Sequence, residues 1–489
     1  MLIKEIYIKN FRAIKEEKFS AKNFSIFIGN NATGKTSVLE AINLALSPHF
    51  LQGKIKHTDF HDGGDEPITI ELEFGSYFTA ELPDGYTTQS VKCNKVRLEI
   101  KKRERATPRK AFSDTVVIEH HLVPLPTTEK GSKEGRWKVK RKRSNKDFEF
   151  DQRLLSLPQV KSKGFPRSFY FSKDRGRQLQ RGFNSSISSV LEDFNWRFSK
   201  GVRKKGEESR DFFGDKKEFE KTILSEVDDS ALKKSFEELN EKLDDFNLNG
   251  VGLSFIDSGA PFNSAFLSQD SEKLDLSVTS LGSGIEMIVS LLFLETLASL
   301  SGDRIIVLVD EPELHLHPSL QEKFTEYLKK LSEDKQVFVS THSPYFFKPC
   351  LNEEQIKLMV TKRRGALVVI EDEESLNLFP WSPSWGEINY SAYDLPTVEF
   401  HNELYGYLQE RENKYFVNEI ESYFSQNGDI PRKEWIRKRG NKQPLVESVT
   451  LMTFVRNSIH HPENNLNDSH TPEELRSSIE EMIKLIPER

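Results

Sequence analysis

The sequence predicts an α/β fold, with an N-terminal head over residues 1–375 and a small α-rich C-terminal domain over residues 376–489. Two observations indicate the head. Short apolar segments alternate with a helical segment between residues 304 and 340, a pattern typical of parallel strands joined by helical crossovers. Segments nearer the N-terminus alternate apolar and polar residues, as antiparallel strands do. After Pro349 the pattern changes, and we place the domain boundary near residue 375.

The elements of the head follow in chain order. Strands are expected at 2–11 and 24–28, with a helix directly after them at 37–46. An antiparallel strand is expected at 68–74. An inserted antiparallel β lobe and helical lid are expected at about 75–270, with strands at 96–101, 116–121 and 136–143 and a charged helix at roughly 212–246. A helix at 285–300 is apolar nearly all round and should be buried. A further helix is expected near 320–331, and further strands at 304–309, 336–340, 356–361 and 366–370. From residue 398 onward the sequence predicts helices.

Composition excludes several classes of protein. The 489 residues leave room for two to four domains at roughly 100–200 residues each. The net charge of −6 means that any nucleic-acid surface must be local. Two cysteines, Cys93 and Cys350, make no disulfide framework, which fits a reducing compartment. No apolar run is long enough to span a membrane and the first residues read as a strand, so we expect a cytoplasmic protein without a membrane segment.

The strongest motif is a phosphate-binding loop that fits G-x-x-x-x-G-K-[ST] at every fixed position. It is preceded by an apolar strand and followed by a helix, the context that this loop requires. Backbone N–H groups of such a loop and the start of its helix face phosphate oxygens. Lys35 is expected to reach the β- and γ-phosphates, and Thr36 to supply a hydroxyl to Mg²⁺. The predicted nucleotide-binding residues are Gly29, Asn30, Asn31, Ala32, Thr33, Gly34, Lys35, Thr36 and Ser37.

Two later strands end in residues suited to nucleotide hydrolysis. The apolar strand 305–309 ends in Asp310 and Glu311. A strand tip can hold Asp310 near the magnesium ion, and Glu311 can then act as the general base for the attacking water. The alternative is a strand that ends in a solvated acidic turn. The strand 336–340 leads to His342, whose imidazole can donate to the γ-phosphate or simply cap the strand.

In this order, the motifs resemble those of the ABC-type ATPases of the RecF/SMC/OLD group, the AAA15-like proteins, across roughly residues 1–349. The resemblance implies an ABC-type P-loop head that binds ATP and Mg²⁺ between two heads of a homodimer or higher oligomer. His342 matches the switch histidine. The signature-motif position holds Ser280, Gly282, Ser283 and Gly284, in an order that leaves open whether Ser280 or Ser283 contacts the γ-phosphate. A glycine-rich turn before a helix is the alternative for this segment.

Three further segments of the head have open interpretations. Asp59 stands about where the glutamine loop is expected and is a secondary candidate for the magnesium ion. His315 and His317 suit a dimer-contact loop better than a metal site, because no Cys or third His lies nearby. The strongest clusters of Lys and Arg that we identify in the sequence are 101–105 and 136–146. Strand alternation in the second run places Lys or Arg on one face, beside Trp137, which suits either a nucleic-acid backbone or a solvated hairpin.

Two C-terminal motifs, at 385–390 and 453–464, resemble the ATPase subunits of bacterial anti-phage systems of the Septu or retron-associated PtuA type or the PARIS AriA type. The resemblance implies an ATPase that senses infection and controls a separate effector nuclease. Arg456 and His461 also fit the R-x4-H pattern of HEPN ribonucleases, although His460, His461 and Pro462 equally suit the end of a helix. We therefore expect a defence ATPase. The alternatives are a RecF-like DNA-repair ATPase that binds DNA through the basic run 136–146, and a self-contained toxin with a C-terminal ribonuclease.

Overall fold

The computed structural model describes most of the head and nearly all of the C-terminal region. The described residues are 2–46, 55–82, 90–102, 116–125, 138–140, 147–149, 155–156, 162–171, 229–246, 251–256, 264–269, 276–277, 284–285, 287–289, 291–292, 295–296, 304–314, 316–343, 346, 348–351, 353–373, 376–427, 431–440 and 442–487. No helix in this described part has the length and apolar content needed to cross a membrane.

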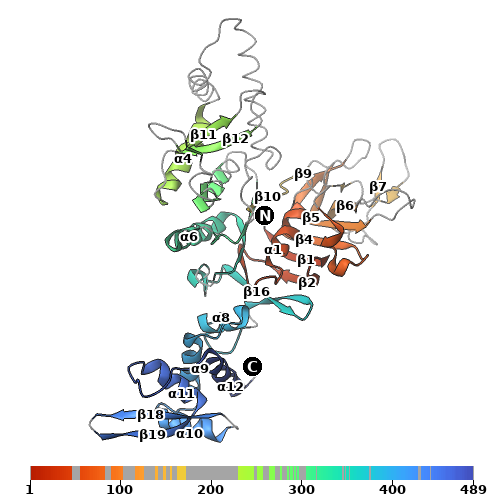
Figure 1. Cartoon of the computed structure of the whole chain (residues 1–489). Coiled ribbons are helices and arrows are strands. Elements are labelled where there is room, and N and C mark those ends of the chain that lie inside the picture. Colours follow the sequence, from red (N-terminus) through yellow and green to blue (C-terminus); the bar gives the residue numbers. More distant parts are fainter. Residues whose placement is uncertain are drawn as a thin grey trace, which may run out of the picture.

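An antiparallel sheet forms the right-hand side of the head in Figure 1. Its strand order is β2 (Ile14–Ser20), β1 (Ile3–Phe11), β4 (Ile68–Glu81), β5 (Ser90–Lys102) and β6 (Val116–Pro124), and β9 (Ser162–Lys163) also pairs with β4. The described strands of the expected β lobe therefore belong to the same sheet as the N-terminal strands. The expected strand at 136–143 does not continue this sheet, because β7 (Lys138–Lys140) pairs with β8 (Asp147–Glu149).

A second sheet of six strands forms the centre of the head. Its order is β10 (Arg167–Phe171), β14 (Ile305–Asp310), β15 (Gln336–Thr341), β3 (Phe24–Ile28), β16 (Ile356–Arg364) and β17 (Leu367–Asp372). The strands are parallel except for β17, which is antiparallel to β16. Strands β3, β14 and β15 are buried at every residue, as strands covered on both faces are. Because β14, β15 and β3 are neighbours, their carboxyl ends meet at one edge.

Helices fill both sides of the central sheet, which confirms the predicted α/β class. Helix α1 (Lys35–Leu46) packs its apolar residues between the two sheets. On the other face lie α6 (Pro318–Asp334) and buried helical residues between 284 and 296, which pack against β14 and β15. The short helices η1 (His57–Asp59), η2 (His61–Gly63) and η5 (Lys348–Cys350) lie in connecting segments. The central sheet is thus the middle layer of the head.

A smaller unit lies above the central sheet in Figure 1. Helix α4 (Asp229–Asp244) is the described part of the expected charged helix, and its Leu239 and Leu243 enter the head core. Beside it, β11 (Val251–Ile256), β12 (Ser264–Gln269) and β13 (Leu276–Ser277) form a three-stranded antiparallel sheet. This small sheet, which we did not predict, lies directly before the signature segment.

The C-terminal unit, residues 376–487, has a hydrophobic core of its own. Its helices are α8 (Trp385–Tyr393), α9 (Val398–Arg411), α10 (Val417–Gln426), α11 (Leu451–His460) and α12 (Pro472–Lys484). The prediction of helix alone from residue 398 was wrong, because β18 (Arg432–Arg439) and β19 (Lys442–Thr450) form a hairpin between α10 and α11. Only Trp435 of β18 is buried, so this strand shows no apolar alternation in the sequence. The hairpin also contains a third cationic run, which the sequence analysis missed.

Helix α8 belongs to both cores. Its Ile388 and Ala392 are buried in the head core, whereas Tyr390 packs against the C-terminal core. The motif at 385–390 explains this docking. A Cβ on Gly386 would lie 2.6 Å from the Cα of Phe400, so only glycine permits the close approach of α8 and α9. The buried Glu387 closes the helix start by accepting hydrogen bonds from the preceding segment.

Candidate active site

The phosphate-binding loop begins where β3 ends and is closed against β16. Gly29 has φ of 142° and Gly34 has φ of 88°, which favour glycine. A Cβ on Gly29 would lie 2.2 Å from the carbonyl oxygen of Thr361. The Thr361 hydroxyl donates to the carbonyl of Ile28 (2.9 Å) and lies 2.7 Å from the hydroxyl of Thr33. Strand β16 therefore fixes the curl of the loop, a contact that the sequence motif does not reveal.

The predicted loop residues separate into a buried base and an exposed apex. The buried residues are Gly29, Thr33, Lys35 and Ser37, the partly buried ones are Gly34 and Thr36, and the exposed ones are Asn30, Asn31 and Ala32. Ala32 has φ of 59°, a left-handed conformation that is uncommon for alanine and that the curl of the loop imposes. The apex thus faces away from the core of this chain.

Lys35 lies beneath the loop, with its side chain folded back on it. Its Nζ donates to the carbonyl oxygens of Gly29 and Asn30, each at 2.7 Å. Burial lowers the pKa of Lys35 to about 8, against the opposing attraction of Glu311, Glu313 and Asp310. Its Nζ also lies 3.5 Å from the hydroxyl of Thr33. A buried amine whose partners are uncharged oxygens is poised to exchange them for phosphate oxygens, whose charge would hold its proton.

Thr36 and Asp310 come together from α1 and the end of β14. The Thr36 hydroxyl donates to Asp310 Oδ1 at 3.1 Å, and the hydroxyl of Ser340 donates to the same oxygen. Hydroxyl and carboxylate oxygens are the ligands that Mg²⁺ prefers, and phosphates and waters complete the shell of an ATP-bound ion. These two side chains therefore fit a magnesium ion, and Ser340 orients the carboxylate.

Glu311 and His342 face each other at the ends of the neighbouring strands β14 and β15. His342 donates from Nε2 to Glu311 Oε1 at 2.9 Å. Glu311 has φ of 47°, and its N–H donates to the carbonyl of Ser340 at 3.0 Å, so the backbone turns sharply there. Burial and then the positive charge of Lys35 lower the pKa of His342, while Glu311 opposes the shift. A neutral imidazole thus holds a carboxylate beside the loop, which suits a general base and its partner.

Glu313 is a site residue that sequence reasoning missed. Its Oε1 accepts hydrogen bonds from the backbone N–H groups of His342 (2.6 Å) and Ser343 (3.1 Å). Burial raises the pKa of Glu313, and the bond from the His342 backbone opposes that shift. The carboxylate therefore positions the segment that carries His342. The only sequence signal was a second glutamate two residues after Glu311.

Asp59 takes part in a different network from the predicted magnesium shell. Its Oδ1 accepts from Arg12 Nε at 2.9 Å, and its Oδ2 accepts from the backbone N–H of Lys56 at 2.8 Å. Arg12 also pairs with Glu40 of α1, with Nη1 and Oε2 2.5 Å apart. These contacts favour a role for Asp59 in joining η1 to the start of the head, and they do not support magnesium ligation.

Several predicted residues cannot be placed. Ser280, Gly282, Ser283 and His315 lie outside the described residues, whereas Gly284 is buried at the start of a helical segment. His317 is the N-cap of α6, and its Nδ1 accepts from the backbone N–H of Ser319 at 3.4 Å. His317 thus has a capping role in this chain. Of the basic run 136–146, only the backbone of 138–140 is described.

Arg456 and His461 lie at the end of α11. The helix ends at His460, and the N–H of His461 donates to the carbonyl of Asn457 at 2.9 Å. Arg456 donates to the side chain of Asn457 at 3.1 Å, and His461 Nδ1 lies 3.4 Å from Glu463 Oε1. The two side chains of the R-x4-H pattern therefore bond to different local partners, which favours the helix-end interpretation.

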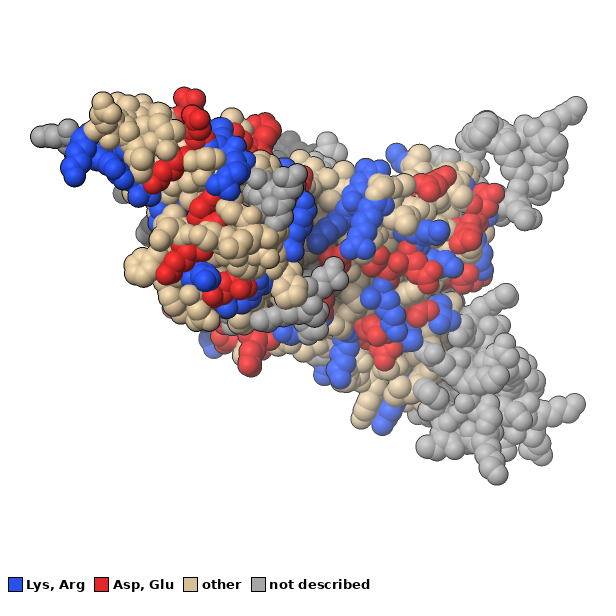
Figure 2. Space-filling model, turned by 90° about the horizontal axis from the view of Figure 1, so that it is seen from below, with Lys and Arg blue, Asp and Glu red and all other residues tan. Residues whose placement is uncertain are grey.

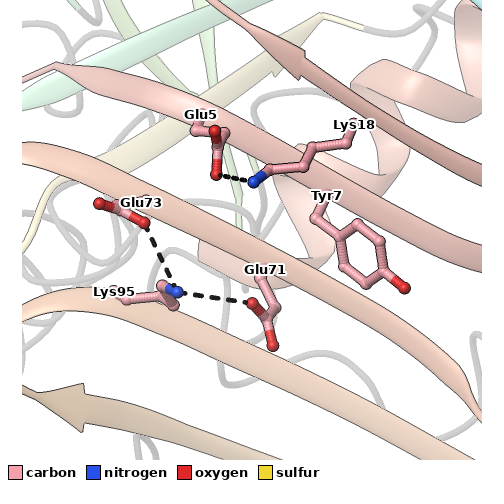
Figure 3. Close-up of a pocket in the computed structure, with 6 residues that line it drawn as sticks. All are labelled: Glu5, Tyr7, Lys18, Glu71, Glu73 and Lys95. Carbon is pink, nitrogen blue, oxygen red and sulfur yellow. Dashed lines mark ion pairs between the residues drawn. The ribbon is translucent and has the colours of Figure 1, made fainter. Parts of the chain in front are cut away.

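A polar recess lies on the solvent face of the antiparallel sheet, and its lining residues are labelled in Figure 3. Lys18 pairs with Glu5 at 2.8 Å, and Lys95 lies 3.5 Å from Glu73. Burial and Glu16 raise the pKa of Tyr7 to about 12. Since these charges neutralise one another within the sheet, the recess gives no support for a second ligand site.

Comparisons with known proteins agree with this geometry. Residues 1–347 match the family model of the AAA ATPase domain (AAA_15). The chain is 24% identical over 393 residues to the OLD nuclease of Thermus scotoductus, covering 77% of this chain and 66% of that protein. It is 23% identical over 394 residues to the retron Vc95 probable ATPase of Vibrio cholerae, covering 73% of each. It is 22% identical over 382 residues to endonuclease GajA of Bacillus cereus, covering 74% of this chain and 59% of GajA. The chain thus spans just under two thirds of the OLD nuclease and less of GajA.

Proposed function

Since the chain belongs to the AAA ATPase domain family, and is an ATPase related to the OLD nuclease, we propose that it is the ATPase subunit of a bacterial anti-phage defence system. In this proposal two heads pair around ATP in the cytoplasm, and their pairing controls a separate effector nuclease. Relatives named as a retron ATPase and as nucleases support a partnership between this head and nuclease activity. The observation that carries the proposal is the meeting of the loop, Asp310, Glu311 and His342 at one edge of the central sheet.

The chemistry follows from that meeting. Lys35 binds the β- and γ-phosphates, and Thr36 and Asp310 are the side chains that would hold Mg²⁺, whose charge would stabilise the transferred phosphoryl group. Glu311 lies on the side of the loop opposite to β16 and accepts the proton of the attacking water. The single N–H of the neutral His342 orients Glu311 before the nucleotide binds, and it turns to the γ-phosphate when that group arrives.

Pairing of two heads is supported by the exposed loop apex. Asn30, Asn31 and Ala32 are exposed, so the described part of one chain does not cover them. A second head can close this side with the signature segment at 280–284, whose Gly284 begins a buried helix. The closed arrangement then places two ATP molecules between two copies of the chain.

Control of an effector is supported by a short path from the site to the C-terminal unit. Glu313 holds the backbone of His342. Burial raises the pKa of the Tyr393 phenol of α8, and the charge of Glu313 adds to that shift. The aromatic ring of Trp385, also in α8, lies under Lys348 Nζ at 5.0 Å from its centroid. A shift of the His342 segment on hydrolysis is therefore passed to α8, and through it to the surface that binds the effector.

Glu311→Gln tests the assignment of the general base. Loss of a general base lowers kcat by about 10²–10⁴-fold, and ATP binding should persist because Lys35 and Thr36 are unchanged. Closed dimers should then accumulate with ATP. Phosphate release and light scattering after size exclusion measure the two effects, with the exposed Glu322→Gln as the control. Unimpaired turnover in Glu311→Gln would exclude Glu311 as the base.

The defence role needs a test in cells and one in solution. Expressed with its neighbouring genes, the wild-type chain should reduce phage plaques, whereas Lys35→Ala should not. Purification with native partners should yield a nuclease whose activity depends on the nucleotide state. Protection by Lys35→Ala, or RNA cleavage by the lone chain that requires His461, would contradict the proposal.

A further inference from the structure

A two-stranded ribbon, β18 and β19, projects from the C-terminal unit (Figure 1). Arg439 is paired opposite Lys442 across a tight turn, in which Gly440 has φ of 57°. The base of the ribbon is fixed by Trp435, which is buried and packs edge-on against Phe454 with ring centroids 5.9 Å apart. Residues 437–440 and 442–444 are all exposed. The ribbon is thus anchored at one end and presented to solvent at the other.

The ribbon concentrates positive charge on a molecule that is negative overall. Six of the residues from 432 to 442 are Arg or Lys and one is Glu, whereas the whole chain has a net charge of −6. At the base, two of these cations join the ribbon to neighbouring helices. Arg432 lies 3.3 Å from Glu421 of α10, and Lys433 lies 2.5 Å from Glu474 of α12. Figure 2 shows blue side chains at the left end of the molecule, the side on which the ribbon projects in Figure 1.

Two of the four cations near the tip have partners within the described part of the fold and two do not. Arg437 lies 3.1 Å from Glu447 but is 54% exposed, and Lys438 donates to the backbone of Glu463. Among the described residues, Arg439 and Lys442 make no ion pair. They are direct cross-strand partners, and like charges in that position destabilise a hairpin. A binding partner with negative charge accounts for their presence.

The edges of the ribbon are protected against pairing with another strand. Asn464 and Asn467 bond to the backbone of Ile436, which covers the edge of β18. Pro444 has no N–H to donate from β19. Covered edges and proline are devices that prevent strand addition. The partner is therefore one that contacts the charged side chains and not the strand backbone.

We propose that the tip of this ribbon binds the phosphate backbone of duplex DNA through Arg437, Arg439 and Lys442. The major groove of B-form DNA admits a two-stranded ribbon, whereas the deep and narrow major groove of A-form RNA does not. The charge density of the tip matches closely spaced phosphates. The ribbon shares no residue with the nucleotide site, so this proposal stands or falls independently of the proposed ATPase role.

The test is DNA binding by the full-length chain, measured by fluorescence anisotropy with a labelled duplex between 50 and 200 mM salt. Each lost phosphate contact lowers the slope of log K against log salt by about 0.9. Arg439→Ala/Lys442→Ala should therefore reduce the magnitude of this slope by about 1.8. Over the fourfold salt range, the affinity of the wild type should then fall about 12-fold more than the affinity of the variant. Removal of opposed like charges leaves the hairpin no less stable, and thermal unfolding and ATP turnover confirm that the variant is folded.

The matched control is Lys330→Ala/Lys414→Ala, which removes two exposed cations elsewhere and should leave the slope unchanged. The proposal is overturned if the tip variant keeps the wild-type slope, or if the control loses as much. Equal binding of duplex RNA would overturn the role of the groove. Binding of polyglutamate in preference to DNA would show that the tip binds an acidic protein.

Discussion

Replacing Glu313 by alanine should slow ATP hydrolysis without preventing ATP binding. The side chain acts on Lys35 only through its charge, which favours the protonated amine, whereas its Oε1 directly holds the N–H groups of His342 (2.6 Å) and Ser343 (3.1 Å). A hydrogen bond to a charged group contributes about 1.5–3 kcal/mol. If loss of the shorter bond destabilises the active position of His342 by that free energy, kcat falls by about 10- to 150-fold. Glu313→Gln keeps an uncharged acceptor at about half the bond strength, so its loss should be only about 3- to 12-fold.

The assay combines steady-state phosphate release with ATP affinity from calorimetry. A positioning role lowers kcat slightly in Glu313→Gln and more strongly in Glu313→Ala. It leaves the Kd for ATP within error of the wild type in both variants. The exposed Glu322→Ala on α6 should change neither quantity. Wild-type kcat in Glu313→Ala would refute the reasoning. Equal losses in affinity and in kcat would show that Glu313 supports the whole loop and does not act through His342.

Two further predictions concern the loop itself. Because burial lowers the pKa of Lys35 to about 8, the Kd for ATP should rise above pH 8 by about tenfold per pH unit, and calorimetry of Lys35→Ala should show no such trend. The same shift makes the free energy of unfolding rise between about pH 8 and 10.5, where the unfolded chain still holds the proton. Gly29→Ala should abolish ATP binding in calorimetry, because its Cβ would lie 2.2 Å from the Thr361 carbonyl oxygen. Gly406→Ala in α9 is the control, because a Cβ there meets open space. It should raise the free energy of unfolding by about 0.5–1 kcal/mol, measured by thermal unfolding. An ATP-binding Gly29→Ala variant would contradict the tight closure of the loop on β16.

The sequence was informative wherever the chemistry is local. The resemblance to the RecF/SMC/OLD group is confirmed by the family match, because the loop, the acidic strand end and the switch histidine are each contiguous and occur in a fixed order. The strand at 24–28 was predicted at its observed bounds, since five apolar or small residues followed by glycine leave few alternatives.

What the sequence could not provide are the contacts between distant segments. The hydroxyls of Thr33 and Thr361 lie 2.7 Å apart although 328 positions separate them, and no periodicity records such a pair. Likewise, the bond from His342 to Glu313 depends on the adjacency of β14 and β15. The ribbon at 432–450 was missed for a different reason, because a strand with one buried residue has the composition of a solvated helix.

The position of α8 decides how the head and the C-terminal unit can move. Ile388 and Ala392 are buried in the head core, so withdrawing α8 from the head would expose apolar surface at a cost of about 25 cal/mol per Å². Tyr390 is tied in the same way to the other core, where its ring lies 5.2 Å from that of Phe400. A flexible linker would absorb a displacement of the His342 segment, whereas a helix packed into both cores must move with one and push on the other. In the proposed function, α8 is therefore the element that would transmit a change at the nucleotide site to the C-terminal unit, whichever partner that unit binds.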